Sequence, residues 1–116
     1  MPLASTRKPL RVLFICAKNR LLSPTAEQVF ANWPGVETAS AGVNRDADNP
    51  VSRELLEWAE LILVMESRHR RKLAEKFRRQ LGKKPIYNLN TPDHYAYMEP
   101  ALVHVLQQRV PPYLSR

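Results

Sequence analysis

The sequence has few of the residues that hold small secreted or metal-dependent domains together. It contains one cysteine and three histidines, so a disulfide framework is impossible and a structural zinc site is nearly excluded. We therefore expect no metal, and a reducing compartment, the cytoplasm. The longest apolar run, over residues 61–65, is far shorter than the roughly 20 residues of a membrane-spanning helix. The N-terminus lacks the apolar core of a signal peptide, so we expect no membrane association.

The length and the distribution of charge indicate a single domain with one strongly basic segment. The 116 residues suit one domain, 1–116, with flexible ends at 1–9 and over the last three or four residues. The net charge of +7 comes from residues 66–84, which contain nine Lys or Arg and two Asp or Glu, whereas the rest contains nine of each. This segment is either a face that attracts phosphorylated protein, nucleic acid or acidic lipid, or an ordinary solvated helix face.

Hydrophobic periodicity predicts that strands and helices alternate along the chain. We expect strands over 10–16, 36–41, 61–65 and 84–89, and helices over 23–33, 52–58, 67–82 and 100–110. Ser23 and Ser67 stand where N-caps are expected, and Gly82 stands at a helix end. Apolar strands separated by helices imply a parallel sheet with helices on both faces, which is a three-layer α/β fold.

Two segments follow strands at the edge of the sheet where ligands are expected, because open parallel sheets bind ligands beyond the carboxyl ends of their strands. These segments are 16–23 and 90–97. Cys16 ends a strand and Ser23 starts a helix, so the loop between them directs backbone N–H groups into one concavity. A phosphate fits there, the thiolate of Cys16 could attack it, and Lys18 and Arg20 add positive charge. The alternative is that Cys16 is a small buried hydrophobe.

Residues 16–27, CAKNRLLSPTAE, resemble the phosphate-binding loop of the low-molecular-weight protein tyrosine phosphatases, which carries a Cys, five residues, then Arg-Ser-Pro and a helix. Segments 40–42 (SAG), 63–67 (LVMES) and 92–95 (PDHY) resemble family segments in the same order. The resemblance covers about residues 10–114 and is closest to a compact bacterial branch of predicted tyrosine phosphatases. It implies a four-stranded parallel sheet in the order 2-1-3-4.

The resemblance also implies an enzyme without metal or cofactor that hydrolyses phosphotyrosine or small aryl phosphates through a cysteinyl-phosphate. Cys16 would be the nucleophile, and Ser23 would stabilise its thiolate. Asn19 would hold the loop in its turn, with its side chain bonding the loop's own backbone. Asp93 would donate a proton to the leaving oxygen and then activate water, unless it is only a turn residue after a proline. Tyr95 would form an aromatic wall for the substrate ring, unless it packs against the closing helix. The loop residues around the phosphate would be Ala17, Lys18, Asn19, Arg20, Leu21 and Leu22.

One position departs from the family pattern. Leu22 stands where the family has the arginine that grips two phosphate oxygens and stabilises the transition state. Losing such a donor typically costs about 10²–10³ in rate, so we expect weakened turnover unless Arg20 or Lys18 compensates. The alternative function is a catalytically weak module that binds phosphate or phosphoprotein, and a nucleic-acid binder working through the basic segment is a third. A single cysteine also disfavours arsenate reduction, which on this fold needs further cysteines.

Overall fold

Four short strands make one parallel sheet in the computed structural model, which describes residues 8–114. The strands are β1 (Leu10–Cys16), β2 (Val36–Gly42), β3 (Leu61–Val64) and β4 (Ile86–Asn88). Their order across the sheet is β2-β1-β3-β4, and every neighbouring pair is parallel. The expected topology is therefore confirmed. The flexible segment expected at 1–9 falls largely on residues 1–7, which lie outside the described residues.

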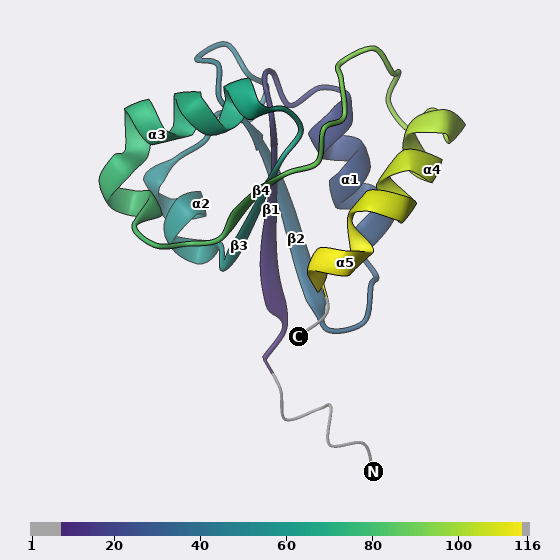
Figure 1. Ribbon diagram of the computed structural model, residues 1–116, viewed down its shortest axis with the longest axis horizontal. Helices are drawn as coiled ribbons and strands as arrows, with labels where there is room; N and C mark the ends of the chain where they lie inside the picture. The colour runs from purple at the N-terminus through teal and green to yellow at the C-terminus, as the bar shows by residue number, and fades with distance from the viewer. Residues whose placement is uncertain (1–7, 115–116) are drawn as a thin grey trace.

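Helices cover both faces of the sheet, as the three-layer prediction requires (Figure 1). One face carries α2 (Arg53–Trp58) and α3 (Ser67–Leu81), and the other carries α1 (Leu22–Phe30), α4 (Pro100–Arg109) and α5 (Pro111–Leu114). Successive side chains of β1 point to opposite faces, so Phe14 and Cys16 join the core under α1 and α4, whereas Leu13 and Ile15 join the core under α2 and α3. Of the residues 8–114, no helix is long and apolar enough to cross a membrane.

Helix α1 begins one residue earlier than the sequence suggested, and Ser23 is not its N-cap. The helix starts at Leu22, the N-cap position is Leu21, and no side chain among residues 8–114 caps this end. Ser23 lies inside the first turn, where its hydroxyl is used by the neighbouring thiol. The helix was expected to reach residue 33, but it ends at Phe30, and Trp33 follows it, 40% exposed, with its ring 5.3 Å from that of Phe30.

The N-terminus of α3 is capped by Glu66, not by Ser67. The Glu66 carboxylate accepts the N–H of His69, and the Nδ1 atom of His69 accepts the N–H of Glu66 at 3.1 Å, which makes a reciprocal capping box. Ser67 is the first helical residue. Gly82 ends the helix at φ 51°, a conformation that glycine adopts without steric cost, as predicted.

The C-terminal region is more ordered than the sequence suggested. The closing helix ends at Arg109 and is followed by the short helix α5, whose Leu114 is buried in the core shared by α1 and α4. The prediction that the last three or four residues fray is therefore wrong for Tyr113 and Leu114, because both side chains have an apolar surface to pack against. Residues 115–116 lie outside the described residues.

Candidate active site

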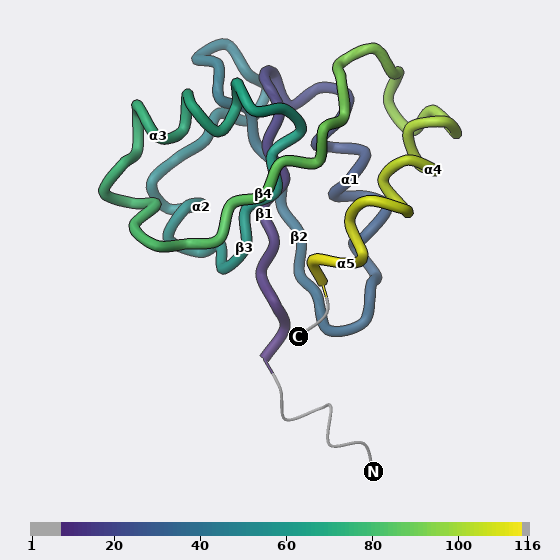
Figure 2. Tube along the Cα trace, in the orientation of Figure 1, coloured from purple at the N-terminus to yellow at the C-terminus, as the bar shows by residue number. Residues whose placement is uncertain are grey.

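The candidate site lies at the carboxyl end of β1, one of the two central strands of the sheet. Cys16 pairs with Gly42 of β2 at that end, and Ile15 pairs with Val64 of β3. Residues 17–21 then carry the chain to the first turn of α1. The path from β4 to α4 crosses the same end of the molecule (Figure 2), and the N–H of Met98 donates to Thr25 of α1 at 2.9 Å. The two segments predicted to bind a ligand, 16–23 and 90–97, therefore both lie at the carboxyl-end edge of the sheet.

The thiol of Cys16 is surrounded by hydrogen-bonding groups of its own loop and helix. Its Sγ accepts the backbone N–H of Asn19 at 3.2 Å and lies 2.9 Å from the Oγ of Ser23. The side chain is 6% exposed. The sulfur is thus surrounded by an N–H donor, a hydroxyl and a helix N-terminus, groups that stabilise negative charge as it develops on sulfur during a reaction. Cys16 also belongs to the hydrophobic core cluster under α1 and α4, so its catalytic role stays a prediction.

Asn19 holds the turn of the loop, in part as expected. It adopts φ 57°, in the left-handed region that asparagine tolerates better than most residues. The sequence suggested that its side chain bonds the loop backbone. In the structure the Nδ2 of Asn19 donates instead to the Oγ of Ser23 at 2.9 Å. Ser23 is fully buried and also lies 3.5 Å from the carbonyl of Ala41. The three side chains of Cys16, Asn19 and Ser23 thus form one connected network.

The segment after β2 backs the loop, which the sequence did not reveal. Backbone N–H groups of Val43, Asn44 and Asp48 donate to the carbonyls of Cys16, Ala17 and Lys18, at 2.9 to 3.0 Å. Because these carbonyls point toward 43–48, the N–H groups of the same planar peptide units, those of Ala17, Lys18 and Asn19, point the opposite way, and the Asn19 N–H meets the Cys16 sulfur there. Gly42 has to be glycine here, since a Cβ would lie 2.5 Å from the loop's own backbone oxygen. Its place in the SAG segment is the one sequence signal of this packing.

The two cations of the loop are tied to carboxylates of the backing segment. The Nζ of Lys18 lies 3.2 Å from Asp46, and the Nε of Arg20 lies 3.0 Å from Asp48. The Lys18 ammonium, through its hydrogen bond and its charge, lowers the pKa of Asp46. All four side chains are about half exposed, so solvent screening leaves each pair little net stabilisation. Neither cation therefore stands over the thiol, although either pair could open at small cost.

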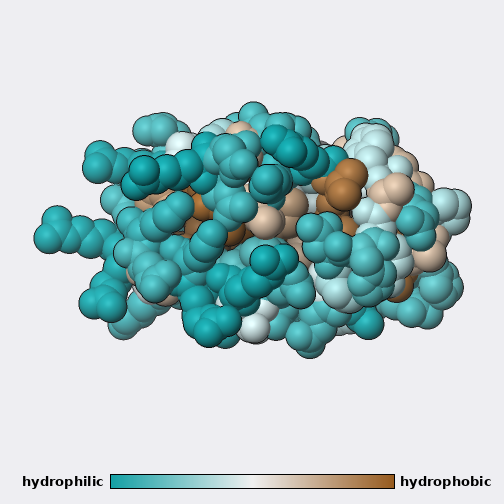
Figure 3. Space-filling view, turned by 90° about the horizontal axis from the view of Figure 1, so that it is seen from above, coloured by the Kyte–Doolittle hydropathy of each residue, from teal (hydrophilic) through white to brown (hydrophobic). Residues whose placement is uncertain are grey.

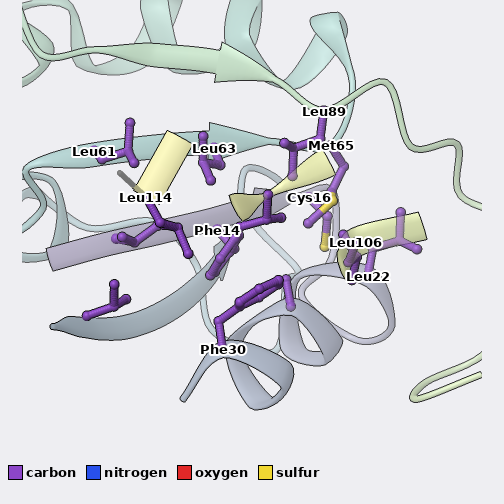
Figure 4. Packing of buried hydrophobic residues seen from close by; sticks show 14 of the residues in the cluster. Phe14, Cys16, Leu22, Phe30, Leu61, Leu63, Met65, Leu89, Leu106 and Leu114 are labelled. Carbon is purple, nitrogen blue, oxygen red and sulfur yellow. The ribbon is translucent and has the colours of Figure 1, made fainter. Parts of the chain in front are cut away.

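Leu22 points into the hydrophobic core. It is 1% exposed and belongs to the cluster that contains Cys16, Phe14 and Leu106. Figure 4 shows it beside Leu106 of α4, among the packed side chains between α1 and the sheet. The neighbouring Leu21 is 39% exposed. The position at which the family carries its phosphate-binding arginine thus contributes packing in this chain.

The segment after β4 brings Asp93 and Tyr95 to the same end of the sheet without placing them at the thiol. Asp93 is exposed, and its charge acts on His69 at the start of α3. Tyr95 is half-buried against the core under α1 and α4, and its ring lies 4.8 Å from that of His94. Within residues 8–114, no hydrogen bond joins either side chain to the 16–22 loop, and no group of three or more His, Cys, Asp or Glu could hold a metal ion. Their predicted roles stay predictions.

Comparison with known proteins identifies the fold. No family model matches the chain. The solved structure of YwlE arginine phosphatase from Geobacillus stearothermophilus is 25% identical, with a TM-score of 0.62 over 87% of this chain and 83% of that one. SP-PTP, a low molecular weight protein tyrosine phosphatase from Streptococcus pyogenes, shares the fold with a TM-score of 0.73 over 92% of this chain and 95% of that one, at 17% identity. The chain therefore has the fold of these phosphatases.

One curated protein is similar to this chain in sequence. It is named protein-arginine-phosphatase, from Geobacillus stearothermophilus, and is 30% identical over 93 residues. The match covers 60% of this chain and 63% of that protein. The recognition made from the motifs in 16–27, 40–42, 63–67 and 92–95 is therefore confirmed at the level of the family.

Proposed function

We propose that this protein is a cysteine-dependent phosphatase that hydrolyses phosphorylated proteins, with phosphotyrosine or a similar aryl phosphate as the substrate group. The observation that carries the proposal is the environment of Cys16, whose Sγ accepts an N–H of Asn19 and lies within hydrogen-bond distance of Ser23 at the start of α1. A nucleophile held this way at a helix N-terminus is suited to attack phosphorus, because the helix end attracts the phosphate that it attacks.

The proposed reaction has two displacements. The Cys16 thiolate attacks phosphorus, the S–P bond forms, and the P–O bond to the leaving group breaks as Asp93 protonates the departing oxygen. Water then attacks the cysteinyl-phosphate, Asp93 takes a proton from that water, the S–P bond breaks, and inorganic phosphate leaves with the thiolate restored. The hydroxyl of Ser23 stabilises the thiolate as leaving group in the second step. Asp93 reaches the site through movement of the exposed segment after β4.

Phosphoarginine is the competing substrate group, because the curated relative is named for it. The exposed rim of the loop favours neither substrate decisively. It carries the charged pairs of Lys18 with Asp46 and Arg20 with Asp48, and the half-buried Tyr95 stands nearby on the segment after β4. Parallel assays with phosphotyrosine and phosphoarginine peptides separate the two.

Slow turnover follows from the core position of Leu22. Without the family arginine, no planar guanidinium holds two oxygens of the transferring phosphoryl group, and this term is worth about 10²–10³ in rate. Arg20 can reach the phosphate only by leaving Asp48, which costs about 1 kcal/mol or less. The burial of Leu22 therefore also supports a second function, a module that binds phosphate or phosphoprotein with little turnover.

The deciding experiment is hydrolysis of p-nitrophenyl phosphate between pH 5 and 7 by the unmodified chain and by Cys16→Ser. For the phosphatase, Cys16→Ser lowers the rate by on the order of 10³ or more. Asp93→Asn lowers it less, because the activated aryl leaving group needs little protonation. The matched control is Glu57→Gln, which removes an exposed carboxylate of α2 and leaves the rate unchanged.

The binding module gives a different pattern in the same samples. The unmodified chain then turns over no faster than Cys16→Ser, yet inorganic phosphate raises its unfolding midpoint as mass action requires. A chain that neither hydrolyses the substrate nor gains stability from phosphate contradicts both functions. Equal, nonzero rates for the unmodified chain and Cys16→Ser contradict the nucleophilic role of Cys16.

A further inference from the structure

A basic cavity adjoins the loop that carries the thiol. It has a volume of about 230 Å³ and lies between the 43–44 segment and the first turns of α3, with Ala17, the residue after Cys16, in its wall. Its charged lining is Arg68, Arg71 and Lys72, against the single carboxylate of Glu75. Viewed onto the carboxyl ends of the strands, hydrophilic side chains crowd the side of the molecule over α3, with apolar surface visible between them (Figure 3).

A buried hydrogen-bond donor forms part of the same wall. His69 is 1% exposed, and its Nδ1 accepts the N–H of Glu66. Because Nδ1 acts as an acceptor, the neutral ring carries its proton on Nε2. Within residues 8–114, this Nε2 is a buried side-chain polar atom without a hydrogen-bond partner. Buried donors are nearly always paired, so a donor without a partner beside a polar cavity points to an acceptor that occupies the cavity.

The cations around the cavity differ in how far they are already engaged. Arg68 is held by Glu66 through two contacts of 2.8 and 3.0 Å, and Lys72 donates to the side chain of Asn44 at 2.8 Å. Arg71 is exposed and has no ion-pair partner in the described part of the chain. Arg71 can therefore offer its whole charge to a ligand, and Lys72, which is bound to a neutral amide, also keeps its charge.

We propose that this cavity is a subsite for a second oxyanion of the substrate, a carboxylate or phosphate on a residue close in sequence to the phosphorylated one. The subsite takes its positive charge from Arg71 and Lys72 and a neutral donor from the Nε2 of His69. Successive residues of an extended peptide advance about 3.3 Å each, so a phosphorylated residue over Cys16 brings its near neighbours to the cavity beside Ala17. The inference rests on the proposed function for the identity of the ligand as a phosphopeptide.

The favoured occupant is a phosphopeptide and not nucleic acid. The cavity contacts the phosphate loop through Ala17 and holds a single buried donor, which suits one localised anion. A nucleic-acid backbone presents a row of phosphates and is bound by many separated cations. The remaining basic residues of α3 are spread over the exposed helix and do not line this cavity.

The test measures binding of fluorescent peptides in which a non-hydrolysable phosphonate replaces phosphotyrosine, so that turnover has no influence. Three peptides carry glutamine, glutamate or phosphoserine on each side of the phosphonate. The acidic peptides should bind about three- to tenfold more tightly than the glutamine peptide. Arg71→Gln should reduce this preference to less than about twofold. Arg70→Gln, one residue away and outside the cavity lining, is the matched control and should preserve it.

The outcomes separate the subsite from the proposed function. A preference near one in the unmodified chain, or equal effects of Arg71→Gln and Arg70→Gln, overturns the subsite even if p-nitrophenyl phosphate is hydrolysed. A preference that depends on Arg71 supports the subsite even if no hydrolysis occurs. The glutamate and phosphoserine peptides distinguish a carboxylate from a second phosphate as its natural ligand. A single-stranded oligonucleotide that competes equally well in the unmodified chain and in Arg71→Gln would indicate a general polyanion surface and refute the subsite.

Discussion

Truncation of Leu22 tests whether this position serves the core or the phosphate site. Leu22→Ala removes three carbons from a side chain that is 1% exposed, a transfer loss of about 2.4 kcal/mol at about 0.8 kcal/mol per carbon. The cavity left behind raises the expected loss to about 3 kcal/mol, within the range of about 2–5 kcal/mol for buried leucines. Leu21→Ala is the matched control: its side chain is 39% exposed, so it should lose at most about 1.5 kcal/mol.

Urea unfolding at 25 °C, followed by tryptophan fluorescence, measures both losses. Trp33 and Trp58 are useful probes because they lie on opposite faces of the sheet, Trp33 against Phe30 and Trp58 in the core under α2 and α3. A loss of about 3 kcal/mol leaves the domain folded, since domains are stable by about 5–15 kcal/mol. Equal destabilisation by the two variants would refute the packing role of Leu22 and return this position to the phosphate site.

Two further predictions concern the polar network and the buried imidazole. Ser23→Ala leaves the Nδ2 of Asn19 buried without an acceptor and should cost about 1–3 kcal/mol together with a fall in kcat for p-nitrophenyl phosphate. Ser52→Ala, which removes the cap of α2 at about 1 kcal/mol, should leave kcat unchanged, and a matching fall in kcat would contradict a thiol-specific role. Burial lowers the pKa of His69 from 6.5 to about 4. Between pH 6.5 and pH 4 the imidazole is therefore protonated in the unfolded chain but not in the folded one, which favours unfolding. Lowering the pH from 7 to 4 should remove about 3 kcal/mol from the free energy of unfolding. Urea unfolding at pH 7 and pH 4 measures this loss. His69→Gln retains an acceptor for the Glu66 N–H and should make the free energy of unfolding depend less on pH. If the variant and the unmodified chain lose the same stability between pH 7 and pH 4, His69 is not the source of the loss.

The fold could be predicted from local patterns because each pattern has one dominant physical cause. Apolar runs of strand length separated by helical periodicity are buried on both faces only in a parallel sheet, and β1 was predicted to the residue. Element ends were less predictable. Ser67 and Glu66 could both cap the start of α3. Glu66 is the N-cap in the structure because His69, three residues later, completes the reciprocal hydrogen bonds of a capping box with it.

The candidate nucleophile could be proposed from the sequence because Cys16 stands between a buried strand and a helix start, in a segment that resembles the family's phosphate-binding loop. Its surroundings were less predictable, since they depend on chain segments that meet only after folding. Three features join residues more than 20 positions apart in the sequence. They are the hydrogen bonds from segment 43–48 to the loop carbonyls, the ion pair of Arg20 with Asp48, and the basic cavity beside α3. Position along the sequence says little about such contacts.

Leu22 shows most clearly which properties follow from the sequence and which follow only from the tertiary structure. The sequence by itself determined that no arginine stands six residues after Cys16, and therefore that the family's phosphate-binding fork is missing. Only the tertiary structure decided what replaced it, because α1 turns this position away from solvent and toward Leu106 of α4. The sequence likewise determined that α3 is basic, whereas packing of α3 against 43–44 decided that Arg71 and the unpaired Nε2 of His69 share one cavity. Composition fixes which charges and apolar groups a chain contains, and the burial imposed by packing fixes which of them meet.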